Sequence, residues 1–149
     1  MELRDRDYER LLEFRTALRQ FLHWSETQAV GAGITAAQHQ LLLAVRGHLG
    51  DRGPTVGDLA DSLLLRHHSA VELIDRAEEA GLVRRVHDPD DRRVVRLRLT
   101  ARGTRVLERL AEVHVEELAR LTPRIRGLFD GLTGWDAGAT RRRPSRRAS

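Results

Sequence analysis

The sequence contains no cysteine and few aromatic residues. Without cysteine the chain has no disulfide, iron–sulfur cluster, thiolate zinc site, cysteine nucleophile or thiol redox sensor. Aromatic residues make up only 4% of the chain, which argues against a large aromatic-lined cofactor site. No run approaches the roughly 18 apolar residues of a membrane span, and the charged N-terminal stretch lacks the apolar core of a signal peptide. We therefore expect a cytoplasmic protein that does not insert into a membrane.

The length and composition are those of one ordinary globular domain. The chain has 149 residues, 40% of them hydrophobic and 32% charged, so it is large enough to bury one main core. Because aromatic side chains are scarce, that core must consist mainly of Leu, Val and Ala.

Positive charge is concentrated in two places. The formal net charge is +4, and the last 16 residues hold five arginines against one aspartate. Residues 1–133 are therefore neutral, but within them residues 84–109 hold nine arginines against four acidic residues. A compact basic patch on a balanced domain is typical of proteins that bind polyanions, because phosphate neutralisation supplies much of the affinity for nucleic acid.

The first half of the chain has the pattern of successive helices. Apolar residues recur at three- and four-residue steps from Arg4 to about Glu26, which predicts a long amphipathic helix. Thr35 and Thr55 are each followed three residues later by a capping partner, so a helix is expected to begin after each of them. A further helix is expected over residues 66–80, with Gly81 ending it.

A hairpin and more helix are expected in the second half. The runs "LVRRV" and "VVRLRL" alternate on either side of "HDPDDRR", which predicts two antiparallel strands with Leu97 and Leu99 facing the body and Arg96 and Arg98 facing water. A last long helix is expected after Thr100, and Pro123 is expected to open a separate short helix. The expected fold class is therefore mainly α with a small antiparallel β-hairpin.

This order resembles the MarR family of bacterial transcription regulators, whose fold is a winged helix-turn-helix. The segments that resemble the family are "ITAAQHQLLLAV", "TVGDLADSLLLRHHSAVELIDRAEEAGLVRR" and "DPDDRRVVRLRLTARG". The resemblance covers roughly residues 5–132. It implies a winged helix-turn-helix with long N- and C-terminal dimerisation helices. The chain departs from the family at Arg66, where a small capping residue is usual.

The resemblance also implies which residues contact DNA. Arg93 would enter the minor groove with Asp91 as its orienting partner and Arg92 beside them, and a narrow A·T-rich groove attracts such a guanidinium. Residues near the start of the second helix of the motif would reach base edges in the major groove. The set expected there is Arg66, His67, His68, Ser69, Val71, Glu72 and Arg76. A solvated hairpin tip is the alternative interpretation of the arginines.

Four segments are expected. Residues 1–34 form an N-terminal dimerisation helix, residues 35–100 the DNA-binding lobe, residues 101–133 the C-terminal dimerisation helices, and residues 134–149 a basic disordered tail. The apolar stripes of the first and last helices exceed what a small lobe can bury, so a homodimer is expected. The tail is interpreted as a DNA-tethering arm, a phosphorylation target or an extension without function.

Other sites are weakly indicated. A small aromatic ligand is expected from the resemblance, with His23, Trp24 and His39 as candidate lining residues, although each fits a packing role as well. Seven histidines suggest a metal site, but no His-x-x-x-His spacing occurs, so we expect no metal and no cofactor. His114 lies on an apolar stripe and is expected in the core or an interface.

The expected function is that of a DNA-binding transcription regulator. It would bind an inverted repeat as a homodimer, act as a repressor, and be released by a small ligand. The sequence contains neither a Gly-rich phosphate loop nor paired carboxylates, so nothing in it suggests an enzyme. The alternative is a winged-helix module for protein or RNA contacts, which would need no arginine at the wing tip.

Overall fold

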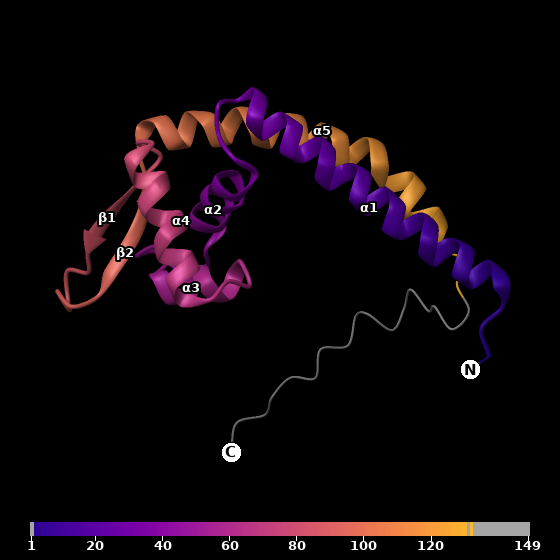
Figure 1. Ribbon diagram of the computed structural model, residues 1–149, viewed down its shortest axis with the longest axis horizontal. Helices are drawn as coiled ribbons and strands as arrows, with labels where there is room; N and C mark the ends of the chain where they lie inside the picture. The colour runs from indigo at the N-terminus through magenta and orange to yellow at the C-terminus, as the bar shows by residue number, and fades with distance from the viewer. Residues whose placement is uncertain (1, 131, 133–149) are drawn as a thin grey trace, which may run out of the picture. The chain divides into compact units, whose positions relative to one another are not determined.

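A computed structural model describes residues 2–130 and 132 of the chain. The elements follow in the order α1 (Asp5–Gly31), α2 (Ala36–Gly47), α3 (Val56–Ser62), α4 (His67–Glu79), β1 (Val83–His87), β2 (Val95–Leu99) and α5 (Ala101–Phe129) (Figure 1). The expected mainly α fold with one antiparallel hairpin is confirmed. No helix among the described residues combines the length and apolar character needed to cross a bilayer. The residues of the expected basic tail, 134–149, lie outside the described part.

The chain divides into two compact units. The winged-helix unit is Trp24–Val115, and the described residues of the helix-pair unit are 2–23, 116–130 and 132. In the winged-helix unit α2, α3, α4 and the hairpin enclose one aliphatic core, in which Leu41, Leu42, Leu59, Ile74 and Leu97 are fully buried. Leucine, valine and alanine make up most of this core, as the composition predicts, and Ile34 and Ile74 complete it.

Two capping boxes start α2 and α3. The Thr35 hydroxyl accepts a hydrogen bond from the Gln38 N–H at 3.1 Å, while Gln38 Oε1 accepts one from the Thr35 N–H at 3.0 Å. Thr55 and Asp58 repeat both contacts at 3.2 and 2.8 Å. Each box satisfies two backbone groups that a helix start leaves open. The predicted starts of α2 and α3 are therefore confirmed.

The helix α4 and the hairpin join through a left-handed glycine. Gly81 has φ +70°, and the Leu82 N–H donates to the Ala77 carbonyl at 2.9 Å, which is the Schellman ending of α4. The strands pair with Val83 opposite Leu99 and His87 opposite Val95. Residues 54–55 add to the free edge of β2, since the Leu97 N–H donates to the Pro54 carbonyl at 2.8 Å.

The first turn of α5 packs directly on the backbone before β1. Thr100 caps the helix by accepting from the Gly103 N–H at 3.0 Å, as expected. A Cβ at Gly103 would lie 2.0 Å from the carbonyl oxygen of Leu82. Only glycine therefore permits this close approach of helix and strand.

In the helix-pair unit the N-terminal part of α1 packs against the C-terminal part of α5. The Phe14 and Phe129 ring centroids are 5.4 Å apart. Arg10 Nη1 donates to the carbonyls of Gly127 and Leu128 at 3.0 Å each, so it caps the end of α5. An ion pair between Arg124 and Glu13 spans 3.5 Å.

Two helix ends differ from the sequence-based expectation. The helix α1 continues to Gly31 instead of ending near Glu26. It ends there because Gly33 adopts a left-handed conformation, at φ +81°, and the Ile34 N–H donates to the Ala29 carbonyl. The helix α5 runs through Pro123 without a break, so the predicted separate short helix is wrong. Proline has a helical φ and costs one backbone hydrogen bond, and the contacts of Phe129 and Arg10 hold the segment that follows.

Candidate nucleic-acid interface

The charged tip of the wing (residues 83–99) is held in place by hydrogen bonds to a buried carboxylate, that of Asp88. Asp88 is only 3% exposed and accepts hydrogen bonds from the N–H groups of Asp90 and Asp91 at 2.9 and 3.3 Å. These contacts close the turn that follows β1. The tip, residues 88–94, is therefore an ordered turn and not a loose loop.

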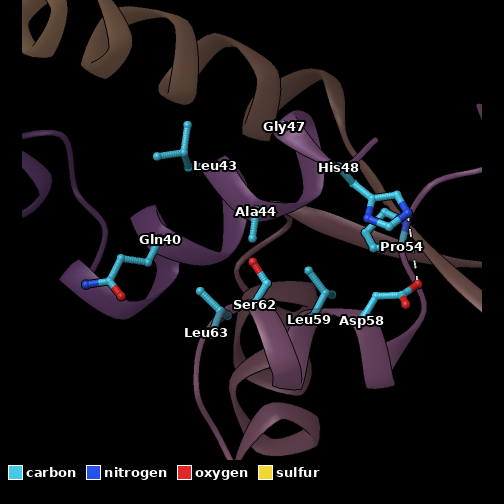
Figure 2. A pocket seen from close by; sticks show the side chains of 10 residues that line it. All are labelled: Gln40, Leu43, Ala44, Gly47, His48, Pro54, Asp58, Leu59, Ser62 and Leu63. Carbon is cyan, nitrogen blue, oxygen red and sulfur yellow. Dashed lines mark ion pairs between the residues drawn. The ribbon is translucent and has the colours of Figure 1, made fainter. Parts of the chain in front are cut away.

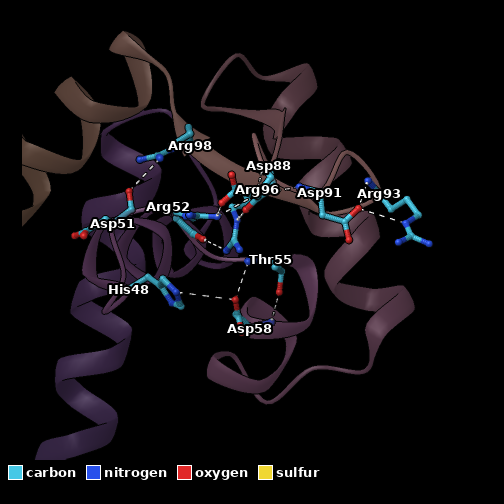
Figure 3. Close-up of polar contacts among 12 residues, drawn as sticks. His48, Asp51, Arg52, Thr55, Asp58, Asp88, Asp91, Arg93, Arg96 and Arg98 are labelled. Atoms are coloured by element: carbon cyan, nitrogen blue, oxygen red, sulfur yellow. Dashed lines mark hydrogen bonds and ion pairs between the residues drawn. The ribbon is translucent and has the colours of Figure 1, made fainter.

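Two arginines from different parts of the chain neutralise Asp88. Arg96 of β2 donates through Nε to Asp88 and through Nη1 to the Gly53 carbonyl, and Arg52 of the α2–α3 loop contacts both Asp88 and Asp90 (Figure 3). The hydrogen bond from Arg96 and those from the backbone lower the pKa of Asp88 to about 2. The expectation that Arg96 faces water is wrong, because its guanidinium donates a hydrogen bond to the buried carboxylate of Asp88.

Arg93 is held at the tip and open to solvent. Asp91 Oδ1 accepts from the Arg93 N–H at 3.0 Å and from its Nε at 3.3 Å. The Arg93 side chain is nevertheless 92% exposed, so its terminal NH₂ groups remain outward (Figure 3). The expected pairing of Asp91 with Arg93 is present. Arg92 is exposed beside it, and its carbonyl accepts from His87 Nδ1 at 2.9 Å.

The N-terminal part of α4 offers an open polar face. Arg66 is the N-cap residue but makes no side-chain capping hydrogen bond, so the first backbone N–H groups of α4 lack a side-chain cap. Of the residues expected to reach bases, five are exposed, namely Arg66, His67, His68, Glu72 and Arg76, and two are half-buried, Ser69 and Val71. The opposite face, with Ala70, Ile74 and Ala77, is buried as predicted.

The other strand arginines separate into two groups. Arg85 pairs with Asp75 at 2.6 Å and Glu78 at 2.8 Å, and this double ion pair ties β1 to α4. Arg84 and Arg98 lie opposite each other on the pleated ribbon and are exposed. The role of Arg85 was missed from the sequence, because spacing does not show which of several carboxylates an arginine contacts.

Known proteins share this arrangement. The sequence profile of the MarR family matches residues 32–94, the stretch that begins before α2 and ends in the wing tip. The transcriptional activatory protein BadR of Rhodopseudomonas palustris is 33% identical over 135 residues, covering 90% of this chain and 69% of BadR. The chain belongs to the MarR family. This confirms the resemblance seen in the sequence.

Other relatives agree with that membership. The HTH-type transcriptional regulator YsmB of Bacillus subtilis is 35% identical over 85 residues, or 57% of this chain, and the chain spans about half (52%) of YsmB. The crystal structure of the S. aureus MepR–DNA complex matches with a TM-score of 0.64 at 23% identity, covering 76% of this chain and 82% of that one, and it shows the same winged-helix fold. The MarR family and these relatives are transcription regulators and not enzymes.

The structure brings together two of the three residues expected at a ligand site of this MarR-family chain. His114 links Trp24 and His39, with ring centroids at 4.8 and 4.7 Å, and Ser25 Oγ lies 2.7 Å from His114 Nε2. Burial, together with the neighbouring His114, lowers the pKa of His39. His114 is thus half-buried and packs against the rings of Trp24 and His39. His23 belongs to the helix-pair unit and is exposed on α1.

A hollow that the sequence did not reveal lies between α2 and α3. Its volume is about 390 Å³, and Leu43, Ala44, Leu59 and Leu63 form its apolar wall (Figure 2). His48 and Asp58 lie 4.0 Å apart at its rim. None of His23, Trp24 and His39 lines it. Within residues 2–130 and 132, no three His, Asp or Glu side chains gather as metal ligands would.

Proposed function

We propose that this chain is a transcription regulator that binds double-stranded DNA through the wing tip and α4. The observation that carries the proposal is the position of Arg93, whose guanidinium is exposed yet attached to Asp91 on a turn braced by a buried acid. A guanidinium held in this way enters a narrow minor groove at a small cost in side-chain entropy. Arg92 lies beside it and would contact a phosphate.

The second part of the proposed interface is the start of α4. His67, His68, Ser69 and Glu72 would approach base edges in the major groove, where serine bonds to either base and glutamate accepts from cytosine. Val71 would contact a thymine methyl group, while Arg66 and Arg76 would contact guanine or phosphate. The uncapped N–H groups of the first turn favour a phosphate oxygen at the same place.

We propose that the protein acts as a homodimer formed by α1 and α5. In the single chain Leu11, Leu12, Leu18 and Leu22 of α1 and Leu118 of α5 stay exposed, with Leu12 at 65%. Burial of such a set against a second copy would stabilise the dimer by about 25 cal/mol per Å². Two wings and two α4 helices would then match an inverted repeat with half-sites about 34 Å apart.

We propose repression as the outcome, by occupation of a promoter, with release by a small ligand. DNA is bound in the MepR complex, which supports DNA as the partner here, whereas BadR is named as an activator. A ligand would act by preferring one spacing of the two DNA-binding surfaces. The cluster around Trp24 and His39 and the hollow between α2 and α3 are the candidate places for it.

The proposal is tested by fluorescence anisotropy with DNA from upstream of the protein's own gene, measured at several salt concentrations. Arg93→Ala should weaken binding at least tenfold and reduce the slope of log K against log salt by about 1. Arg109→Ala, which removes an exposed arginine of α5, is the matched control and should leave both unchanged.

Equal binding by the wild-type protein and Arg93→Ala would refute the role of the wing. Absence of binding at low salt, or binding of double-stranded RNA as tightly as DNA, would refute the function itself. In vitro transcription from the bound promoter then distinguishes repression from activation.

A further inference from the structure

A second hollow, of about 340 Å³, lies at the base of the wing and plays no part in the proposed function. The C-terminal end of α2, strand β2 and the first turns of α5 contribute its walls. Three arginine side chains from separate elements line it, namely Arg46 of α2, Arg84 of β1 and Arg98 of β2. His48 and Thr104 add further polar groups.

The arginines of this basic hollow repel one another. Arg84 and Arg98 are directly opposite in the strand register, which brings their Cβ atoms to about 5 Å, where like charges destabilise a ribbon. Among the described residues, Arg46 and Arg84 make neither an ion pair nor a hydrogen bond to a carboxylate, and Arg98 donates only to the backbone carbonyl of Asp51, at 3.2 Å (Figure 3).

The remaining arginines of the strands show that pairing is available in this fold. Arg85 has two carboxylate partners, and Arg96 has the buried Asp88. Among the four strand arginines, only the opposed pair Arg84 and Arg98 therefore lacks a carboxylate partner in the described part of the chain. Local arrangements that oppose stability tend to mark functional sites, and three guanidinium groups around one space are complementary to an anion with several charged oxygens.

We propose that the basic hollow binds a small anion that carries a phosphate group or at least two carboxylates. Its volume lies at the lower end of the range for small-ligand sites, roughly 300–1,000 Å³, which suits a small metabolite. Guanidinium groups from three elements would bind separate oxygens, and the ligand would cancel the repulsion between Arg84 and Arg98.

The site is separate from the proposed DNA contacts. The pair Arg84–Arg98 lies three residue pairs, or about 10 Å, from the His87–Val95 pair next to the tip. It is nevertheless connected to the tip through one short loop. Arg98 bonds to Asp51, and the next residue, Arg52, bonds to Asp88 and Asp90. An anion that draws Arg98 toward itself would thus change the support of the wing tip.

The test uses the full chain and inorganic pyrophosphate as the probe, with chloride at matched ionic strength as the reference. Isothermal titration should give saturable binding with one site per chain, and the melting temperature should rise with pyrophosphate. Arg84→Gln should weaken this binding at least tenfold. The same variant in chloride should melt about 1–3 °C higher than the wild type, because the like-charge pair is gone. Arg109→Gln is the matched control and should behave as the wild type.

Three results would overturn the proposal. One is binding that does not saturate. Another is equal pyrophosphate affinity in the wild type and Arg84→Gln, which would place the anion outside the hollow, on other arginines of the chain. The third is an Arg84→Gln variant that loses as much DNA affinity as Arg93→Ala does, while pyrophosphate leaves the melting temperature of the wild-type protein unchanged. That result would make the hollow a contact for DNA phosphates.

Discussion

The close approach of α5 to the backbone before β1 makes Gly103 the most constrained glycine that a mutation can test. The added Cβ of Gly103→Ala would meet the Leu82 carbonyl oxygen at 2.0 Å and its carbon at 2.9 Å. That oxygen already accepts hydrogen bonds from the Thr100 N–H at 3.1 Å and the Thr100 hydroxyl at 3.2 Å. Relief of the clash must therefore move the backbone at a fully buried leucine and weaken both bonds.

The size of the effect follows from three contributions. Overpacking costs about 1–3 kcal/mol, loss of one hydrogen bond costs about 1 kcal/mol, and the better helix propensity of alanine returns about 1 kcal/mol. Gly103→Ala should thus lower the free energy of unfolding by about 2 kcal/mol. Gly127→Ala, in the same helix with nothing within 4 Å of its added Cβ, should raise it by up to about 1 kcal/mol.

Urea unfolding followed by circular dichroism at one fixed protein concentration measures both variants, because dimer formation would make stability depend on concentration. The two substitutions should change the midpoint in opposite directions with similar m-values. If Gly103→Ala is as stable as the wild type, the described contact between α5 and Leu82 is wrong.

Three further outcomes are expected. The pKa of Asp88 is lowered from 3.8 to about 2 in the folded chain, so its contribution to stability is complete above pH 4 and is lost as the pH falls toward 2. Asp88→Asn should therefore flatten the acid side of a plot of unfolding free energy against pH. An unchanged curve would argue against the buried ion pairs. Thr55→Ala removes a capping box and should cost about 1 kcal/mol in urea unfolding, whereas Thr104→Ala, at a residue that caps no helix, serves as the comparison. Leu12→Glu should convert the proposed dimer to a monomer in analytical ultracentrifugation, and a dimer that persists would place the interface elsewhere.

Local signals in the sequence determined most of the fold. The Thr-x-x-Gln and Thr-x-x-Asp boxes fixed where α2 and α3 begin, because their hydrogen bonds close within four residues. The alternation of "VRLRL" fixed which face of β2 is buried, with Leu97 inside. The pairing of Asp91 with Arg93 was expected from the resemblance to the MarR family, and it is a local contact between residues two positions apart on one turn.

What the tertiary structure decided concerns contacts between distant residues. Arg52 lies 36 residues from Asp88, and no local pattern indicates that it supports the wing, or that Arg96 is withdrawn from water. The continuation of α5 through Pro123 depends likewise on contacts with α1 more than 100 residues away. Spacing along a chain specifies hydrogen bonds within a turn or a helix, but which charges meet across elements depends on how those elements pack.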